Sequence, residues 1–317
     1  MIDFRYLVVT IISIFLALTV GIMLGAGFVG DPLARDLQNR IKTVQSEVNV
    51  QREQIDQLRA QNNSLTQWAQ AVEPWAVEGR LNGRDVVLFA VDGADGGVVE
   101  GTVTVLEEAG ANVVTQINLA PKLALESQPE ADQLATIVDS VESEPSGVRM
   151  DAADALGEGA AALALDSDET TEEGEGSAQV AYSELLRLLE DEDFVSVARN
   201  GDESDVVPSG SSFVIAGGNA TARPFEVPAF VTRLSSELTA GETEVVVTES
   251  SSSQWEMVTA VREDGEINES VSTVDTGERA LGHVAVVLVL SGPEDTPAGH
   301  FGMGDGTRLL PEPSPEE

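Results

Sequence analysis

A short glycine-rich stretch near the C-terminus holds side chains that can bind a metal ion. Residues 297–311 read PAGHFGMGDGTRLLP and contain His300, Met303 and Asp305. A thioether and an imidazole suit a soft ion such as Cu(I), whereas a carboxylate suits a harder one. These three residues are therefore a candidate metal site. The alternative is a tight loop whose glycines shape the backbone.

Two other glycine-rich stretches follow predicted strands, where α/β proteins often bind ligands. DGADGG (92–97) lacks the G-x-G-x-x-G spacing and places Asp92 and Asp95 where a pyrophosphate would be repelled. AGGNATARP (216–224) has glycine amides that could meet an anion near Arg223, but a plain turn between a strand and a helix explains the same pattern. The sequence therefore gives little support for a nucleotide site.

The composition argues against catalysis. The chain has two histidines and no cysteine, so disulfides, thiolate sites and most nucleophile–base pairs are unavailable. It contains no P-loop, no G-x-S-x-G and no H-E-x-x-H motif. We predict no enzymatic activity, no catalytic residue and no cofactor. The second histidine, His283, is expected to open a buried strand and to be satisfied by hydrogen bonds within the core.

Acidic residues dominate the charge. The chain has 55 acidic and 17 basic residues, a formal net charge of −38. Binding to nucleic acid needs clustered Lys and Arg, so we predict no nucleic-acid partner. Such a surface suits a solvent-facing domain in high salt, where repulsion between charges is screened.

The N-terminal segment predicts a membrane anchor over residues 1–30. Residues 7–24 are uncharged and apolar apart from three hydroxyl side chains, and with the following glycines they reach the length that crosses a bilayer. A cleaved signal peptide and a buried core helix are the alternatives. The flanking positive charges do not decide the orientation. We expect the large domain to lie outside the cytoplasm, because domains of this size cross regardless of such charges.

Residues 31–79 predict a coiled-coil stalk that joins copies of the chain. Asp31 and Pro32 are a favourable helix start, and Pro74 is expected to end the helix. Alternating steps of four and three residues select a narrow seam: Leu37, Ile41, Val44, Val48, Gln51, Ile55, Leu58, Asn62, Leu65, Ala69 and Val72. A long helix that packs back on its own domain is the alternative.

Residues 80–317 predict an acidic three-layer α/β domain with a mostly parallel sheet. Apolar strands are expected at 85–91, 109–120, 211–218, 243–250 and 282–290. Helices are expected up to Glu108 and at 129–143, 150–165, 178–191, 225–240 and 253–264. The charged segment 166–177 is expected to be disordered. The similar starts of 85–119 and 211–290 are consistent with two related half-domains.

Several stretches together resemble the mycobacterial copper transport protein B (MctB) family of actinobacterial envelope proteins. They are FLALTVGIMLGAGFVGDPL (15–33), LNGRDVVLFAVDGAD (81–95), ESVSTVDTGERALGHVAVVLVLSG (269–292) and the closing GHFGMGDGTRLLP. The resemblance implies a cell-envelope protein of copper efflux, described as a channel-forming outer-membrane protein, and it carries over no copper ligands.

Two functions follow as hypotheses. The first is a copper-transport envelope protein that keeps intracellular copper low, with copper as the transported ion. The second is a membrane-anchored scaffold whose α/β domain binds another envelope component. A porin-type channel needs many strands of roughly ten residues that alternate between lipid and lumen. The strands expected here are short and wholly apolar, so conduction would require oligomerised N-terminal helices.

Overall fold

A computed structural model describes residues 4–28, 30–165, 172–200, 206–241, 243–293, 297–304 and 306–311, without the side chains of 26–28, 30–35 and 172–176. The chain divides into two compact units, residues 1–67 and residues 68–317. We call them the helical unit and the α/β unit and describe each by itself.

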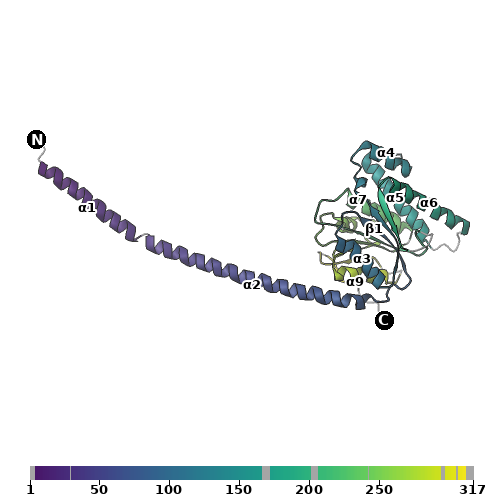
Figure 1. Ribbon diagram of the computed structural model, residues 1–317, viewed down its shortest axis with the longest axis horizontal. Helices are drawn as coiled ribbons and strands as arrows, with labels where there is room; N and C mark the ends of the chain where they lie inside the picture. The colour runs from purple at the N-terminus through teal and green to yellow at the C-terminus, as the bar shows by residue number, and fades with distance from the viewer. Residues whose placement is uncertain are drawn as a thin grey trace. The chain divides into compact units, whose positions relative to one another are not determined.

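The first helix of the helical unit is α1 (Phe4–Phe28) (Figure 1). Its segment Phe4–Gly25 is long and apolar enough to cross a membrane, and none of it is buried within the protein. The alternative of a buried core helix is therefore wrong. The hydroxyls of Thr10 and Ser13 donate to the carbonyls of Tyr6 and Val9, four residues earlier, at 2.8 and 2.9 Å. Such bonds satisfy polar side chains in a helix that lipid surrounds.

The second helix, α2 (Gly30–Val77), is 48 residues long and extends into the α/β unit. It begins one residue before the predicted cap, and the prediction that Pro74 ends it is wrong. Pro74 lies inside the helix, and its carbonyl accepts the amide of Glu78 at 3.0 Å. Proline removes one backbone donor, but Gly79, with φ +74°, supplies the left-handed residue that ends the helix.

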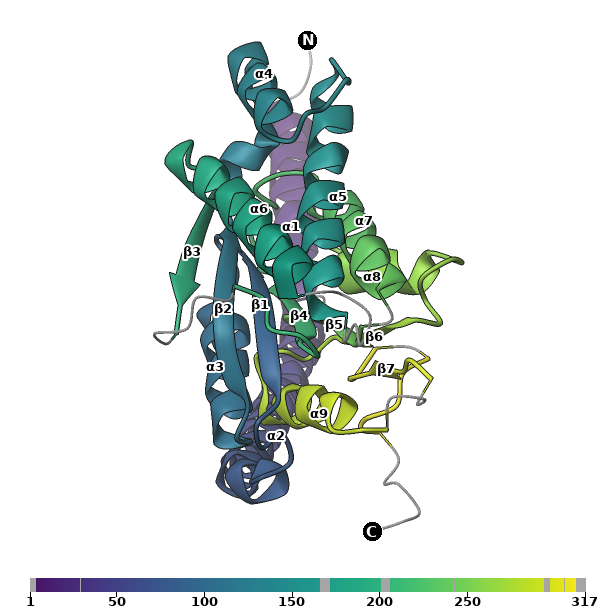
Figure 2. The ribbon, with the colours of Figure 1, turned by 90° about the vertical axis from the view of Figure 1, so that its right-hand side faces the viewer.

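Within the described residues of the α/β unit, seven strands form one sheet in the order β3-β2-β1-β4-β5-β6-β7. Their bounds are β1 (Asp85–Val91), β2 (Asn112–Leu119), β3 (Val195–Arg199), β4 (Ser212–Gly217), β5 (Val245–Glu249), β6 (Val271–Val274) and β7 (His300–Phe301). Figure 2 shows β3 at one edge and β7 at the other. All neighbouring strands pair in parallel except β2 and β3, which are antiparallel. The predicted mostly parallel sheet is confirmed, although β3, β6 and β7 were not predicted as strands.

The helices of this unit supply two buried apolar clusters. They are α3 (Gly96–Glu108), α4 (Gln128–Ile137), α5 (Pro145–Ala164), α6 (Glu172–Asp191), α7 (Val227–Ala240), α8 (Met257–Glu263) and α9 (Ala280–Leu290), with a 3-10 turn at Pro121–Ala124. Alternate residues of β1 point to opposite faces, so Val87 and Phe89 join the cluster with α4–α8. Val86 and Leu88 join the cluster that contains α3, α9 and Val77 from the end of α2.

Residues 282–290 are not a strand, contrary to the prediction, because they form most of α9. The run ALGHVAVVLVL is apolar all round, and every residue in it is buried or half-buried. Periodicity cannot separate a buried helix from a buried strand in so short a run. The strand that pairs in parallel with β5 is instead β6, which has four residues.

Several predicted helix boundaries also differ. Helix α5 begins at Pro145, five residues before its predicted start, and α8 begins at Met257, four residues after its predicted start. Helix α4 ends at Ile137, six residues before the predicted end, because Asp139 takes a left-handed conformation with φ +52°. Of the segment expected to be disordered, 166–171 lies outside the described residues, and 172–177 forms the start of α6.

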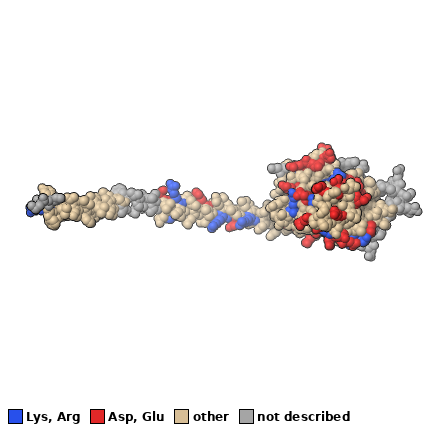
Figure 3. Space-filling model, turned by 90° about the horizontal axis from the view of Figure 1, so that it is seen from above, with Lys and Arg blue, Asp and Glu red and all other residues tan. Residues whose placement is uncertain are grey.

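The two units differ in charge. Residues 1–67 hold six basic and six acidic residues, so their net charge is zero. Residues 68–317 hold the other 11 basic and 49 acidic residues and therefore the whole net charge of −38. Figure 3 shows acidic side chains spread over the visible face of the α/β unit.

Candidate functional site

The loops at the carboxyl ends of the parallel strands form the candidate site. In a sheet of this type a ligand binds where the strand order reverses, because the loops on either side diverge there. The reversal lies between β1 and β4, since the chain passes from β1 to β2 on one side and from β4 to β5 on the other. The two glycine-rich stretches singled out in the sequence follow these two strands, so the structure brings them together.

Hydrogen bonds join the loop after β1 to the loop after β4 at the place where the strand order reverses. The amide of Asp95 donates to the carbonyl of Gly218 at 2.9 Å. The Asn219 side chain donates to the carbonyl of Gly93 at 2.8 Å. Gly218 has φ +95°, a backbone conformation that favours glycine. The loops thus bind each other at the position where a ligand would separate them.

The start of helix α3 is occupied by a carboxylate of the protein. Asp95 is the N-cap residue, and its Oδ1 accepts the amide of Gly97 at 2.8 Å. Glycine-rich loops of dinucleotide-binding proteins present such amides to a phosphate. Arg223, the predicted anion partner, instead pairs with Glu226 at 3.0 Å. Both observations favour the plain-turn interpretation of these loops.

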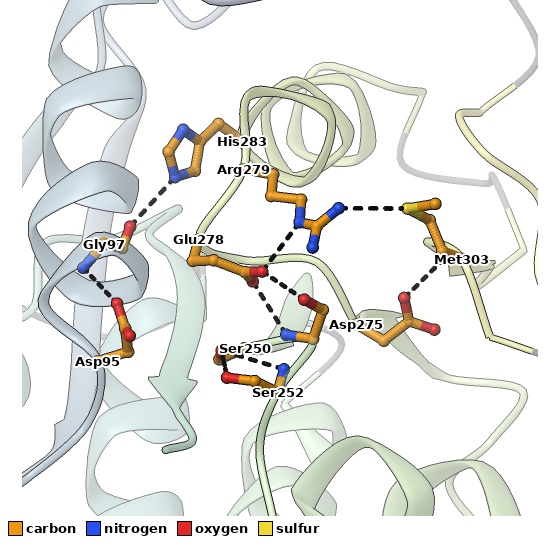
Figure 4. A network of polar contacts seen from close by, with 10 residues as sticks. Asp95, Gly97, Ser250, Ser252, Asp275, Glu278, Arg279, His283 and Met303 are labelled. Atoms are coloured by element: carbon orange, nitrogen blue, oxygen red, sulfur yellow. Dashed lines mark hydrogen bonds and ion pairs between the residues drawn. The ribbon is translucent and has the colours of Figure 1, made fainter. Parts of the chain in front are cut away.

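Two further carboxylates, Glu249 and Glu278, fasten the loop after β5, and Figure 4 shows the contacts of Glu278. Glu249 is 5% exposed and accepts the amide of Val258, in the first turn of α8, at 2.9 Å. Glu278 accepts the amide of Ser251 at 2.9 Å and also its hydroxyl. Burial alone would raise the pKa of Glu278, but the hydrogen bonds from Ser251 and Arg279 outweigh it and lower the pKa. Each of these carboxylates therefore has a structural role.

The C-terminal loop is held by Asp275, which directly follows β6. Asp275 accepts the amides of Met303 at 2.7 Å and Gly304 at 3.1 Å, and pairs with Nη1 of Arg262 at 3.0 Å. Gly302 has φ +132°, and a Cβ there would lie 1.8 Å from Asp275 Oδ1. The loop can approach this carboxylate only because glycine has no side chain.

Arg262 completes the connection between β6 and the loop. Its Nε donates to the hydroxyl of Thr273 at 2.8 Å and its Nη2 to the carbonyl of Phe301 at 3.1 Å. Thr273 and Asp275 belong to the STVD stretch, and Phe301 to the closing GHFGMG stretch. Two motifs on which the family resemblance rests are thus one structural unit.

The candidate metal ligands belong to this unit. His300 lies in β7, half-buried, with Nδ1 2.9 Å from the Thr273 hydroxyl. Burial, and then the charge of Arg262, lower the pKa of His300, so the neutral ring is favoured near pH 7. Met303 is 65% exposed, and its sulfur lies 3.8 Å from Nη1 of Arg279. Asp305 lies outside the described residues, so the three-residue metal site stays a prediction.

Among the described residues, no three His, Asp or Glu side chains gather in a group that could hold a metal ion. A surface depression of about 470 Å³ opens elsewhere, and its lining includes Thr232 of α7 and Glu263 of α8. Its lining holds none of the candidate residues.

The other histidine, His283, joins three helices. Its Nδ1 lies 2.6 Å from a carboxylate oxygen of Glu73 in α2, and its Nε2 lies 3.3 Å from the carbonyl of Gly97 in α3. The ring fits against Gly101, where a Cβ would lie 2.4 Å from Nε2. The expectation that His283 is satisfied by hydrogen bonds is confirmed, although it lies on a helix and not on a strand.

The protonation of His283 follows from these partners. Burial lowers the pKa of His283, but the hydrogen bond and charge of Glu73, with the carbonyls of Gly97 and Gly277, outweigh burial and raise it. Because Glu73 and Gly97 both offer acceptors, the protonated ring satisfies both of them.

Sequence reasoning assigned no role to Asp275, Arg262, Glu249, Glu278 or Glu73. The STVD stretch contains Asp275, but its partners lie 28 and 29 residues further along the chain. In a chain with 55 acidic residues, no sequence signal separates these carboxylates from those on the surface.

Comparisons with known proteins agree over nearly the whole chain. The profile of the family described as "Copper transport outer membrane protein, MctB" matches residues 1–311. Proteins named copper transporter MctB from Mycobacterium tuberculosis (strain H37Rv) and Mycobacterium bovis are each 24% identical to it over 321 residues. These alignments cover 96% of this chain and 98% of each relative. The chain therefore belongs to the MctB family of copper transport outer membrane proteins.

Proposed function

We propose that this chain works in copper export at the cell envelope and keeps intracellular copper low. The observation that carries the proposal is the family match over residues 1–311, together with relatives named copper transporters that align along their whole length. No single residue of the α/β unit carries it.

The proposed arrangement assigns a role to each part of the chain. Helix α1 anchors the protein in a membrane, and α2 forms a coiled-coil stalk that joins copies of the chain. The α/β unit is a three-layer domain that lies outside the cytoplasm. Its two buried apolar clusters, on opposite faces of β1, support the three-layer arrangement. Its net charge of −38 attracts cations to its surface, because many negative charges close together raise the local concentration of positive ions.

The C-terminal loop is the proposed point of copper contact, through His300 and Met303 with Asp305 as a further ligand. Two observations support it: the lowered pKa of His300 favours the neutral ring that binds metals, and the Met303 side chain is exposed. The bonds from Met303 and Gly304 to Asp275 fix the loop backbone beside these side chains. Copper here is cargo, not a resident cofactor.

The protein is proposed to have no enzymatic activity. At the carboxyl edge of the sheet, Asp95, Glu249, Asp275 and Glu278 all accept backbone amides. Carboxylates engaged in this way are poorly placed to exchange protons with a substrate, which supports a role in binding or transport.

A second candidate is a membrane-anchored scaffold whose α/β unit binds another envelope component. The closed loops between β1 and β4 favour it, because they leave the outer surface of the unit for binding. Crosslinking of the α/β unit to an envelope protein, with unchanged copper tolerance in a deletion strain, would favour this candidate over copper export.

The copper role is tested in a deletion strain. We expect the strain to become copper-sensitive and the intact gene to restore tolerance. Copper tolerance equal to that of the parent strain would contradict the proposal.

Copper contact is tested separately by Cu(I) titration of the full chain in detergent. We expect His300→Ala and Met303→Ala to weaken binding and Leu309→Ala, an exposed neighbour, to leave it unchanged. Equal affinity in all three variants would remove the loop as a ligand site but not the transport role.

A further inference from the structure

Helix α2 carries a narrow seam of exposed apolar side chains. Between Leu37 and Leu65 its apolar side chains are 37–65% exposed: Leu37, Ile41, Val44, Val48, Ile55, Leu58 and Leu65. They recur at alternating steps of four and three, which keeps them on one narrow face. An apolar stripe of this kind in water needs a partner of matching periodicity.

We propose that the partner is the same helix of a second copy, in a parallel, two-stranded coiled coil over residues 37–65. The proposal gives number and direction to the oligomeric stalk of the proposed function and involves no copper. In heptad letters, Ile41, Val48 and Ile55 occupy position a, and Leu37, Leu58 and Leu65 occupy position d.

The residue types favour two strands over three or four. Parallel dimers prefer β-branched residues at position a and leucine at position d. Ile41, Val48 and Ile55 follow this preference at a, and three of the five d positions are leucine, whereas Val44 and Gln51 occupy the other two. Asn62 also occupies an a position, where paired asparagines fix the register and the number of strands at a cost in stability. Gln51, at a d position, meets its own counterpart in a parallel pair.

The flanking charges favour the parallel direction. Glu47 lies at position g and Arg52 at the following e position, so in a parallel pair Glu47 of one copy faces Arg52 of the other on both sides. Antiparallel pairing over the full seam would bring two Arg52 side chains together. It would also set Gln51 against Ile55 and Asn62 against Val44, placing polar side chains opposite apolar ones.

The position of α1 also favours parallel helices. Helix α1 ends at Phe28 and α2 begins at Gly30, so the anchor lies at the N-terminal end of the seam. Two copies inserted in one membrane with the same orientation would both extend α2 away from that membrane. Their seams then run in the same direction.

The first experiment measures mass and proximity in the full chain in detergent. The protein contains no cysteine, so one introduced cysteine reports one position. We expect two copies of the 33.4 kDa chain by light scattering. Asn62→Cys should form a disulfide with its own counterpart under mild oxidation, because facing Cα atoms at an a position lie within disulfide range. Ala60→Cys, on the outer face, is the matched control and should stay monomeric in a denaturing gel.

The other outcomes each contradict a part of the proposal. In a full antiparallel overlap the two Asn62 residues would lie about 27 Å apart, at 1.5 Å per residue, so no such disulfide could form. A mixture of Val44→Cys and Asn62→Cys chains would then crosslink to each other. Three or more copies per particle would overturn the two-stranded state, and a single copy would overturn the pairing. None of these readouts involves copper, so they are independent of the copper role.

Exchanging the charges at Glu47 and Arg52 tests, without an introduced cysteine, whether the two helices run parallel. Arg52→Glu should raise the dissociation constant about tenfold, because it sets Glu47 against a second carboxylate on both sides of the pair. Adding Glu47→Arg should restore the wild-type value. Failure of the second change to rescue the first would overturn the parallel register. Fluorescence of Trp255, a tryptophan 1% exposed, verifies that the α/β unit stays folded, and it is measured here and below in a chain in which Trp68→Phe and Trp75→Phe remove the two other tryptophans.

Discussion

In the helical unit, the apolar side chains of α1 and of the α2 seam lie at the surface, whereas those of β1 in the α/β unit are at most 2% exposed. The charge divides in the same way. The helical unit is neutral, and the α/β unit carries the whole net charge of −38.

This difference shows where each unit obtains its stability. The α/β unit buries its apolar residues internally and fastens its loops with carboxylates. The helical unit has no core of its own among the described residues, so in the proposed arrangement lipid covers α1 and a second copy covers the seam of α2. Changes that act on one unit should therefore leave the other nearly unaffected.

The largest effect is expected from charges placed in the seam. Ile55→Asp with Leu58→Asp should raise the dissociation constant of the proposed dimer at least about a hundredfold, because both copies would bury two unpaired carboxylates. Sedimentation of the full chain in detergent measures this. The control is the urea midpoint of Trp255 fluorescence, which should not change. A shift of that midpoint would show that the units are coupled.

Loss of the carboxylate that holds the C-terminal loop should come next. Asp275→Ala should lower the free energy of unfolding of the α/β unit by about 2–4 kcal/mol, because it removes the acceptor of Nη1 of Arg262 and of two backbone amides. Glu108→Ala, at an exposed position, should change it by less than about 0.5 kcal/mol. Urea titration followed by Trp255 fluorescence compares the two variants, and equal midpoints would mean that Asp275 does not hold the loop.

Salt should affect the two units differently, because only the α/β unit carries a net charge. Between low and molar NaCl, we expect the free energy of unfolding of the α/β unit to rise by about 1–2 kcal/mol, because screening weakens the repulsion among its acidic residues. The neutral helical unit should show little change in its dissociation constant over the same range. A strong salt dependence of dimerisation would show that repulsion between the two acidic α/β units, and not the neutral seam alone, sets the dissociation constant.

The smallest effect is expected from the His283–Glu73 pair. Because the pKa of His283 is raised in the folded state, its contribution is fully present below about pH 6.5, its ordinary value, and is lost as pH rises through the raised pKa. Glu73→Gln should cost about 1 kcal/mol below pH 6.5 and progressively less above it. Urea midpoints measured from pH 5 to pH 9 follow this loss.

His300 serves as a control for these pH measurements, because its pKa is shifted in the opposite direction from that of His283. Its pKa is lowered in the folded state, so its contribution is present above about pH 6.5 and is lost as pH falls through the lowered value. His300→Gln should therefore flatten the acid side of the profile, and Glu73→Gln the alkaline side. Identical profiles for the two variants would show that neither histidine sets the pH dependence.

Much of the fold could be predicted from the sequence, because local pattern reports local structure. The span of α1, the helical seam of α2 and strand β1 at residues 85–91 depend on composition and periodicity within a few neighbouring turns. Where two structures share one pattern, the prediction failed. The apolar run at 282–290 became α9 because β6 fills the strand position beside β5.

The candidate site shows the limit more clearly. Residue types alone were enough to single out side chains able to bind a metal ion, His300 and Met303 among them, and to show that the α/β unit is acidic. The contact between Asp275 and the loop of Met303, and the contact between Glu73 and His283 across 210 residues of chain, became visible only in the folded structure. Residue type and spacing fix what a side chain is able to bind. Which partner it meets depends on how distant segments pack, and no local pattern encodes that.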